Sequence, residues 1–227
     1  MNNDVTDVTT KEDAAKVVDE NPPLKPNEVR FSPIFPTLIG EVMLELPVED
    51  MVSDVIKISS DTRNYEGGFT TFFDRKNLDD VRGMKELKEA IGGIAATFGR
   101  EHKYEMNYDR CAIDVWVNVM NKAGSHNTHN HKNTYFSGAF YARIDEEMSP
   151  LLLRNPTHVW RSKEAMINPK DLTAFTSEWM VIQPKPNMLY IWPSWLEHRV
   201  PQMDQDKPMA GPRISFNFNV DYLPMGV

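Results

Sequence analysis

Apolar residues recur at helical spacing in two segments of the first half of the chain. In residues 48–56 they follow the i, i+3, i+4, i+7, i+8 pattern of one helix face, formed by Val48, Met51, Val52, Val55 and Ile56. A second helix is predicted over residues 78–98, with a stripe spaced by three or four residues that consists of Met84, Leu87, Ile91, Ile94 and Phe98. Gly92 and Gly93 weaken this helix by about 1 kcal/mol each relative to alanine. A strand over residues 37–46 is expected before the two helices.

After residue 110 the apolar period changes to two, which is the period of a strand. In residues 113–120 an apolar face alternates with a mixed face that contains Trp116 and Asn118, as in a strand that lines a polar pocket. Further strands are predicted over residues 134–142, 179–182, 188–192 and 213–220. In the last of these, four polar residues alternate with four apolar ones, in the order Arg213, Ile214, Ser215, Phe216, Asn217, Phe218, Asn219 and Val220. Several short strands after two helices predict a mainly β sandwich or barrel with flanking N-terminal helices.

The domain organisation follows from length and polarity. Residues 1–27 are polar, have no sustained apolar period and end in a run rich in proline, so we expect a flexible N-terminal tail there. A chain of 227 residues fits one domain with a sizeable core. Residues 28–227 are therefore expected to form that single domain.

Charge and cysteine content narrow the class of protein. The formal net charge of −8 argues against a surface that binds nucleic-acid phosphates. Cys111 is the only cysteine, so neither an internal disulfide nor a thiolate zinc cage can form, which suits a reducing compartment. Because no basic start followed by an apolar stretch is found at the N-terminus, we expect no secretory signal, and no run approaches the roughly 18 apolar residues of a membrane span. We expect a cytoplasmic protein without a membrane partner, and a homodimer is compatible with the sequence.

The histidines carry the candidate chemistry. Three of the six lie within six residues, at His126, His129 and His131. His129 and His131 are two residues apart, so on an extended backbone both rings project from the same face. His126 is out of phase with this pair, and both a ligand role and a supporting or pocket role stay open for it. His198 is the distant fourth histidine. The other two, at positions 102 and 158, are expected to be structural or solvated.

No histidine is followed two residues later by a carboxylate, so the usual pair of histidines and one carboxylate of a facial iron site is not encoded here. If a metal binds, His131 takes the place of the carboxylate and three neutral imidazoles hold the ion. That set leaves Fe(II) its full positive charge, which favours an anionic cosubstrate. Arg213 lies beyond His198 on a strand face with Ser215, and a guanidinium beside a hydroxyl makes a good carboxylate clamp.

The order of these residues resembles that of the 2-oxoglutarate/Fe(II)-dependent oxygenases of bacteria and their phages. The first half of the family's progression, W-x-N, H-x-H-P and S-G-x-Y-Y, is matched by Trp116-Val-Asn118, His129-x-His131 and Ser137-Gly-Ala-Phe-Tyr141. The second half, K-P-G, F-P-S-W-L, H and R-I-S-x-x-F-N, is matched by Lys185-Pro-Asn187, Trp192-Pro-Ser-Trp-Leu196, His198 and Arg213-Ile-Ser-Phe-Asn-Phe-Asn219. The resemblance begins at Phe31-Ser-Pro-Ile-Phe-Pro36 and covers about residues 30–222. Lys132 stands in place of a proline, Asn187 in place of a glycine and Trp192 in place of a phenylalanine.

The resemblance implies a double-stranded β-helix, the jelly-roll core that is also cupin-like. It implies Fe(II) held by His129, His131 and His198. It also implies 2-oxoglutarate held by Arg213 with Ser215, and further cosubstrate contacts from Tyr141 and Asn118. The implied activity is a dioxygenase that hydroxylates a small-molecule or peptide substrate with release of succinate and CO₂, in a host cytoplasm if the protein is of phage origin.

Two other interpretations keep parts of this pattern. A three-histidine, cupin-type dioxygenase would oxidise a directly bound substrate without 2-oxoglutarate, and Arg213 would hold that substrate's own carboxylate. A jelly-roll binding module would have no turnover and would need no metal. Anaerobic titration with 2-oxoglutarate separates the first alternative from the oxygenase, and metal analysis separates the second.

Overall fold

The computed structural model describes residue 26 and residues 36–59, 67–73, 78–104, 106–157, 172–174 and 176–223. Within these residues two helices precede most of the strands, as the sequence predicted. The helical elements are α1 (Val48–Ser59), α2 (Met84–Glu101) and the 3-10 turn η1 (Tyr108–Arg110). The strands are β1 (Gly40–Met43), β2 (Gly68–Thr70), β3 (Cys111–Met120), β4 (His126–His129), β5 (Phe136–Arg143), β6 (Leu151–Arg154), β7 (Trp179–Ile182), β8 (Met188–Pro193), β9 (His198–Val200) and β10 (Arg213–Tyr222). No described helix has the length and apolar character needed to cross a membrane.

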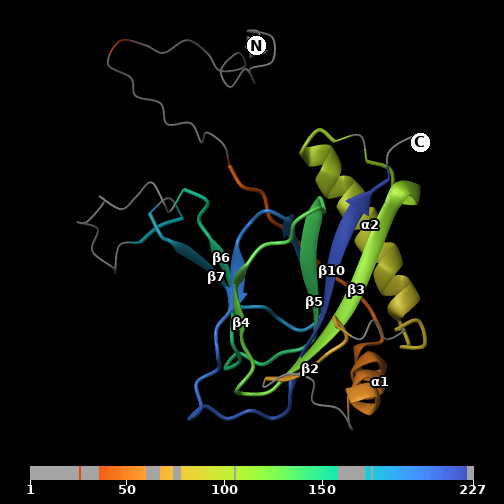
Figure 1. Ribbon diagram of the computed structural model, residues 1–227, viewed down its shortest axis with the longest axis vertical. Helices are drawn as coiled ribbons and strands as arrows, with labels where there is room; N and C mark the ends of the chain where they lie inside the picture. The colour runs from red at the N-terminus through yellow and green to blue at the C-terminus, as the bar shows by residue number, and fades with distance from the viewer. Residues whose placement is uncertain are drawn as a thin grey trace, which may run out of the picture. The chain divides into compact units, whose positions relative to one another are not determined.

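The strands form two antiparallel sheets, which Figure 1 shows as separate layers. The larger sheet has the order β1-β8-β5-β10-β3-β2, and the smaller has the order β4-β9-β6-β7. In the larger sheet β10 lies between β5 and β3, where Phe216 is opposite both Phe140 and Val117. In the smaller sheet His129 of β4 is directly opposite His198 of β9. Strands that follow one another in the sequence thus often lie in different sheets, as in the β sandwich that the sequence predicted.

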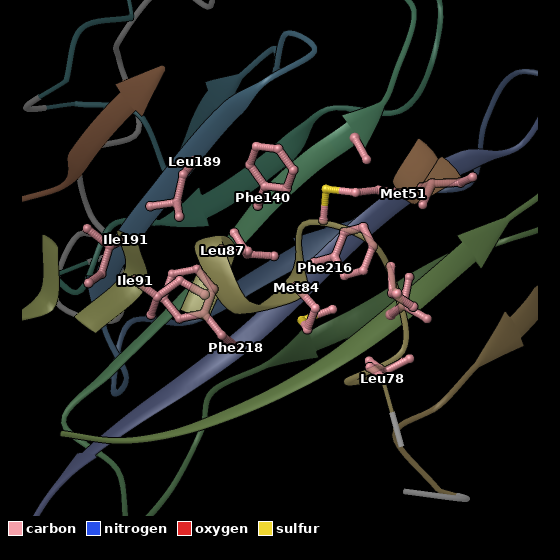
Figure 2. Close-up of a cluster of buried hydrophobic side chains, with 14 of the residues drawn as sticks. Met51, Leu78, Met84, Leu87, Ile91, Phe140, Leu189, Ile191, Phe216 and Phe218 are labelled. Carbon is pink, nitrogen blue, oxygen red and sulfur yellow. The ribbon is translucent and has the colours of Figure 1, made fainter. Parts of the chain in front are cut away.

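Both predicted helices pack on the face of the larger sheet that turns away from the smaller one (Figure 1). Figure 2 shows the resulting core, in which side chains from α1, α2 and the larger sheet point toward one another. Met51, Leu87 and Phe216 have no exposed surface. Complete burial of such side chains contributes about 1.5–3 kcal/mol each by the hydrophobic effect.

The start of α2 differs from the prediction. The helix begins at Met84 and not at residue 78, because Gly83 immediately before it has a left-handed backbone with φ of 81°. A side chain at Gly83 would also meet Pro47, whose Cγ lies 2.8 Å from an added Cβ. Leu78 and Val81 are still buried, but they pack from the turns that lead into the helix.

The alternation along β10 separates the two faces of the larger sheet. Ile214, Phe216 and Phe218 are fully buried in the core under the helices. The opposite face belongs to a second cluster of buried residues, which lies between the sheets and includes Tyr141, Tyr190 and Trp192. This inner face carries the polar residues on which the candidate site depends.

Some elements were not predicted. The strand expected over residues 37–46 is only four residues long, at β1, and β2, β4, β6 and β9 were missed. Each missed strand has three or four residues, which is too short for an apolar alternation to be recognised. The expected N-terminal tail and the start at Phe31 lie outside the described residues except for Pro26 and Pro36, and the single-domain assignment of residues 28–227 stays a prediction.

Candidate metal centre

Three histidine rings converge between the two sheets. His129 ends β4, His198 begins β9, and these strands are paired at this point. His131 follows two residues after β4, and its backbone N–H donates to the carbonyl of Ser194 at 2.9 Å. The ring centroids are 4.3 Å apart for His129 and His198, 5.2 Å for His129 and His131, and 5.1 Å for His131 and His198. One nitrogen from each ring lies within 4.8 Å of the other two, so the three could hold one metal ion.

Hydrogen bonds at Nδ1 determine which nitrogen of each ring is available. His129 Nδ1 lies 2.7 Å from the carbonyl of Asn127, and His198 Nδ1 lies 2.9 Å from the carbonyl of Leu196. His131 Nδ1 lies 2.5 Å from the side-chain oxygen of Asn219. Carbonyl and amide oxygens only accept hydrogen bonds, so Nδ1 carries the proton in all three neutral rings. The lone pair of each Nε2 is then free for a metal.

His131 is held by two side chains of the larger sheet, whereas the other two rings contact backbone carbonyls at Nδ1. Ser137 Oγ lies 2.9 Å from His131 Nδ1 and donates to Asn219 Oδ1, also at 2.9 Å. Ser137 and Asn219 are opposite each other on β5 and β10. The side-chain amide of Asn219 thus fixes the ring of His131, which takes the place of the usual carboxylate ligand.

Burial favours the uncharged form of two of these rings, His198 and His131. It lowers the pKa of His198 to about 3, and the neighbouring His129 lowers it further. Burial is also the main cause of the lowered pKa of His131, although the hydrogen bond to Asn219 opposes it. The desolvation of a cation explains both directions. At neutral pH these two imidazoles are therefore deprotonated, the form that coordinates metals.

Arg213 is a buried cation without an anionic partner among the described residues. Its side chain is 4% exposed. One terminal nitrogen contacts the sulfur of Met120 at 3.2 Å, and the other donates to the hydroxyl of Tyr141 at 3.3 Å. Its Nε is buried and has no hydrogen-bond partner. A buried charge with neutral partners alone is costly, so this arrangement indicates that an anion completes the site.

The other predicted site residues lie around the same cavity of about 640 Å³. Tyr141 and Asn118 line it, and burial raises the pKa of the Tyr141 hydroxyl. Ser215, two residues after Arg213, is buried, but its hydroxyl donates to Asn217 at 3.4 Å and the residue does not line the cavity. His126 lines the cavity outside the three-histidine group, and burial, followed by Arg213, lowers its pKa to about 4.

Several site residues were missed from the sequence. Asn219 and Ser137 support His131, and Phe72 and Phe73 line the cavity. Asn219 could have been found, because it shares the polar face of β10 with Arg213. His102 has the structural role that was expected, since its Nδ1 bonds to the carbonyl of Phe98 at 2.8 Å. Position 158 lies outside the described residues.

Comparisons with known proteins gave a match to one family model and several solved structures of similar fold. Residues 114–219 match the sequence model of the family described as "Putative 2OG-Fe(II) oxygenase". No curated protein matches this sequence. A solved Pseudomonas putida prolyl-4-hydroxylase has a TM-score of 0.53 at 8% identity, over 83% of this chain and 94% of that one. EvdO2 from Micromonospora carbonacea var. aurantiaca gives 0.54 at 9% identity, over 84% and 89%. Its complex with 2-oxoglutarate gives 0.50 at 10% identity, over 83% and 88%.

At these identities the structural likeness shows the fold alone. It confirms the predicted double-stranded β-helix, which the two antiparallel sheets form here. The family match begins within β3 and ends within β10. It therefore contains all three clustered histidines and Arg213.

Proposed function

We propose that this chain, whose residues 114–219 match the model of the family described as "Putative 2OG-Fe(II) oxygenase", is an Fe(II)- and 2-oxoglutarate-dependent dioxygenase. The proposed substrate is a small molecule or a peptide, and the proposed reaction is hydroxylation with release of succinate and CO₂. The proposed location is the cytoplasm. The observation that carries the proposal is one cavity that contains three preset imidazole donors and a buried guanidinium without an anion.

The proposed metal ligands are the Nε2 atoms of His129, His131 and His198. The donor set fits the ion, since neutral imidazole is a ligand for Fe(II). Their Nδ1 atoms already donate to oxygens, so binding requires no change of tautomer. A facial set of three would leave open positions for other ligands.

The proposed cosubstrate site centres on Arg213. Its free Nε and its position beside Tyr141 fit a carboxylate, which a guanidinium binds with charge-assisted hydrogen bonds. Asn118 lines the same cavity as Arg213, and Ser215 lies two residues after Arg213 on β10. A dianion fits the charge of this site, because the three protein ligands to the metal are neutral.

The residues of the chain bind and orient, and they limit access of water. Bound Fe(II) and 2-oxoglutarate supply the oxidising chemistry with O₂, which the side chains themselves cannot supply. Asn219 and the two backbone carbonyls hold the imidazole protons at Nδ1. Trp192 is buried with its ring 5.1 Å from His198 and excludes solvent from that side of the centre.

The absence of a carboxylate from the three-histidine group also suits a metal dioxygenase that does not use 2-oxoglutarate. In that case Arg213 would hold the carboxylate of the substrate. The family match favours the 2-oxoglutarate enzyme, and the two candidates give opposite results in the experiment below.

The experiment is calorimetric titration of 2-oxoglutarate into the iron-loaded full-length protein under argon. We expect binding to weaken by about tenfold to a hundredfold in Arg213→Met, which corresponds to the loss of a charge-assisted hydrogen bond. Arg100→Met removes an arginine of α2 whose terminal nitrogen bonds to Thr97, outside the cavity, and should bind as the wild type does. Wild-type protein that holds iron but not 2-oxoglutarate would contradict the proposal. A panel of small molecules and peptides screened for succinate release then addresses the substrate.

A further inference from the structure

Three aromatic side chains form a wall of the cavity that runs from the surface to the proposed metal ligands. Phe73 is 71% exposed, Phe72 is 40% exposed and Trp116 is 6% exposed. The rings meet edge to face, with centroids 5.4 Å apart for Phe73 and Phe72 and 5.2 Å for Phe72 and Trp116. The Trp116 centroid lies 5.8 Å from that of His131. We call Phe72, Phe73 and Trp116 the aromatic wall.

Hydrogen bonds to β3 hold this wall in place. The backbone N–H of Thr71 donates to the carbonyl of Val117, and the N–H of Val117 donates to the Thr71 hydroxyl, both at 3.0 Å. Thr70 Oγ1 donates to Asn118 at 2.6 Å and accepts from the N–H of Phe72 at 3.1 Å. The segment that carries the two phenylalanines is thus fixed to the strand that carries Trp116. Preorganised aromatic side chains of this kind bind a ligand with little loss of side-chain entropy.

The apolar exposure indicates what kind of group binds. Large apolar side chains exposed side by side at the rim of a cavity mark a binding surface. Phenyl faces and edges pack well against another flat ring, in stacked or edge-to-face geometry. A ring on the substrate would cover Phe73 and Phe72 while the rest of the molecule extends toward the metal.

The charges of the cavity indicate the sign of the substrate. Among the described residues that line it, none is Asp or Glu, although the chain has 33 acidic residues. Its charged lining residues are Arg213 and Lys132. With the metal dication and the cosubstrate dianion bound, their charges cancel in the sum, so Arg213 and Lys132 leave the cavity with a net positive charge even though the cosubstrate pairs with Arg213. This net positive charge favours an anionic substrate over a cationic one, and the lining offers no carboxylate to pair with a cation.

We propose that the substrate is a small molecule with a flat apolar or aromatic ring and a carboxylate or similar anionic group. The ring packs against Phe72 and Phe73, and the anion lies toward Lys132. The cavity of about 640 Å³ has to hold the metal, 2-oxoglutarate and the substrate together, which limits the substrate to a small molecule. This inference rests on the proposed function, because it takes the metal and 2-oxoglutarate to occupy the inner part of the same cavity.

The test uses the full-length protein loaded with zinc, in place of iron, and 2-oxoglutarate, and measures binding of three probes by saturation-transfer NMR. Indole-3-propionate carries the ring and the anion, and tryptamine carries the ring and a cation. Hexanoate carries the anion with a flexible alkyl chain in place of the ring. We expect indole-3-propionate to bind at least about fivefold more tightly than either of the others. Phe73→Ser should weaken its binding about fivefold, and Phe73→Tyr should preserve it.

Tyr104→Ser is the matched control, since Tyr104 is 45% exposed and does not line the cavity. It should bind the probe as the wild type does. Equal binding of tryptamine, an unchanged affinity in Phe73→Ser, or no binding of indole-3-propionate overturns the inference while loading with zinc and 2-oxoglutarate still supports the proposed function. Failure of that loading overturns both.

Discussion

His131 Nδ1 lies 2.5 Å from Asn219 Oδ1, across 88 positions of the sequence. The first residue follows β4 and the second lies on β10, so the contact links the smaller sheet's loop to the inner face of the larger sheet. Such partners of a metal ligand set its tautomer and orientation. The pair therefore gives the site its third donor in a usable form.

Replacement of Asn219 tests that relationship. Asn219→Ala removes the acceptor of the Nδ1 proton, and we expect iron affinity to fall by about tenfold or more. Asn219→Asp keeps an acceptor and adds negative charge near the ion, so it should bind iron at least as tightly as the wild type. Competition with a coloured chelator measures both. Asn127→Ala is the control, because Asn127 supports His129 through its backbone carbonyl. Equal iron affinity in Asn219→Ala and Asn127→Ala would show that the contact has no role in metal binding.

Replacement of His131 tests the ligand itself. His131→Asp restores the usual set of two histidines and one carboxylate, so the purified variant should retain more iron than His131→Ala. Elemental analysis after dialysis measures the difference. If both variants lose iron to the same extent, either His131 is not a ligand or the pocket cannot accept the shorter side chain. Cobalt titration of the Asp variant at millimolar ion concentration distinguishes these two explanations.

The glycine pair in α2 gives a matched prediction about stability. A Cβ added at Gly93 meets nothing within 4 Å, whereas one added at Gly92 lies 2.4 Å from the ring of Tyr108. Gly93→Ala should therefore stabilise the protein by about 0.5–1 kcal/mol through helix propensity. Gly92→Ala should lose that gain or be destabilising, because the Tyr108 ring has to move. Urea denaturation provides the two free energies. A larger gain at Gly92 than at Gly93 would be inconsistent with the packing of α2.

Asp54 predicts a dependence of stability on pH. Its carboxylate accepts two hydrogen bonds from the Arg82 side chain, at 2.8 and 2.9 Å, which hold the pKa of Asp54 well below its ordinary value of 3.8. Because the folded pKa is depressed, the contribution is fully present above the unfolded pKa and is lost as pH falls below about 4. Asp54→Asn should thus be less stable than the wild type at pH 7.

The measurement is urea denaturation of both proteins between pH 7 and pH 3. The free-energy gap between them should narrow as the pH falls below the unfolded value. Asp79→Asn removes an exposed ion pair with Lys88 and should cost little at pH 7. A gap for Asp54→Asn that is constant over the whole range would show that Arg82 does not stabilise the charged carboxylate.

The longer strands of the larger sheet could be predicted, because apolar and polar residues alternate clearly along them. In β10 the apolar residues Ile214, Phe216 and Phe218 are all fully buried, and the intervening face carries Arg213 and Asn219 into the cavity. Strand β4 could not be predicted, because it has four polar residues and its pairing with β9 comes from tertiary contact.

The histidines and Arg213 could be predicted from their spacing in the sequence, but the hydrogen bonds that hold the histidine rings in place could not. The expectation for His129 and His131 assumed one strand, whereas β4 ends at His129 and the His131 ring comes alongside after the chain leaves the sheet. The bonds of His131 to Ser137 and Asn219 depend on the register between β5 and β10. The position of Phe73 depends in the same way on hydrogen bonds between Thr71 and Val117. Register between distant strands cannot be read from local periodicity.

The most direct test of the central claim is the absorption spectrum of the iron-loaded protein during a titration with 2-oxoglutarate under argon. If three imidazoles hold the ion and Arg213 holds the far carboxylate, a visible metal-to-ligand charge-transfer band should appear and saturate at a single equivalent. The band should be absent from His131→Ala and should require far more 2-oxoglutarate in Arg213→Met. Iron-loaded wild-type protein that shows no such band at any concentration would contradict the account.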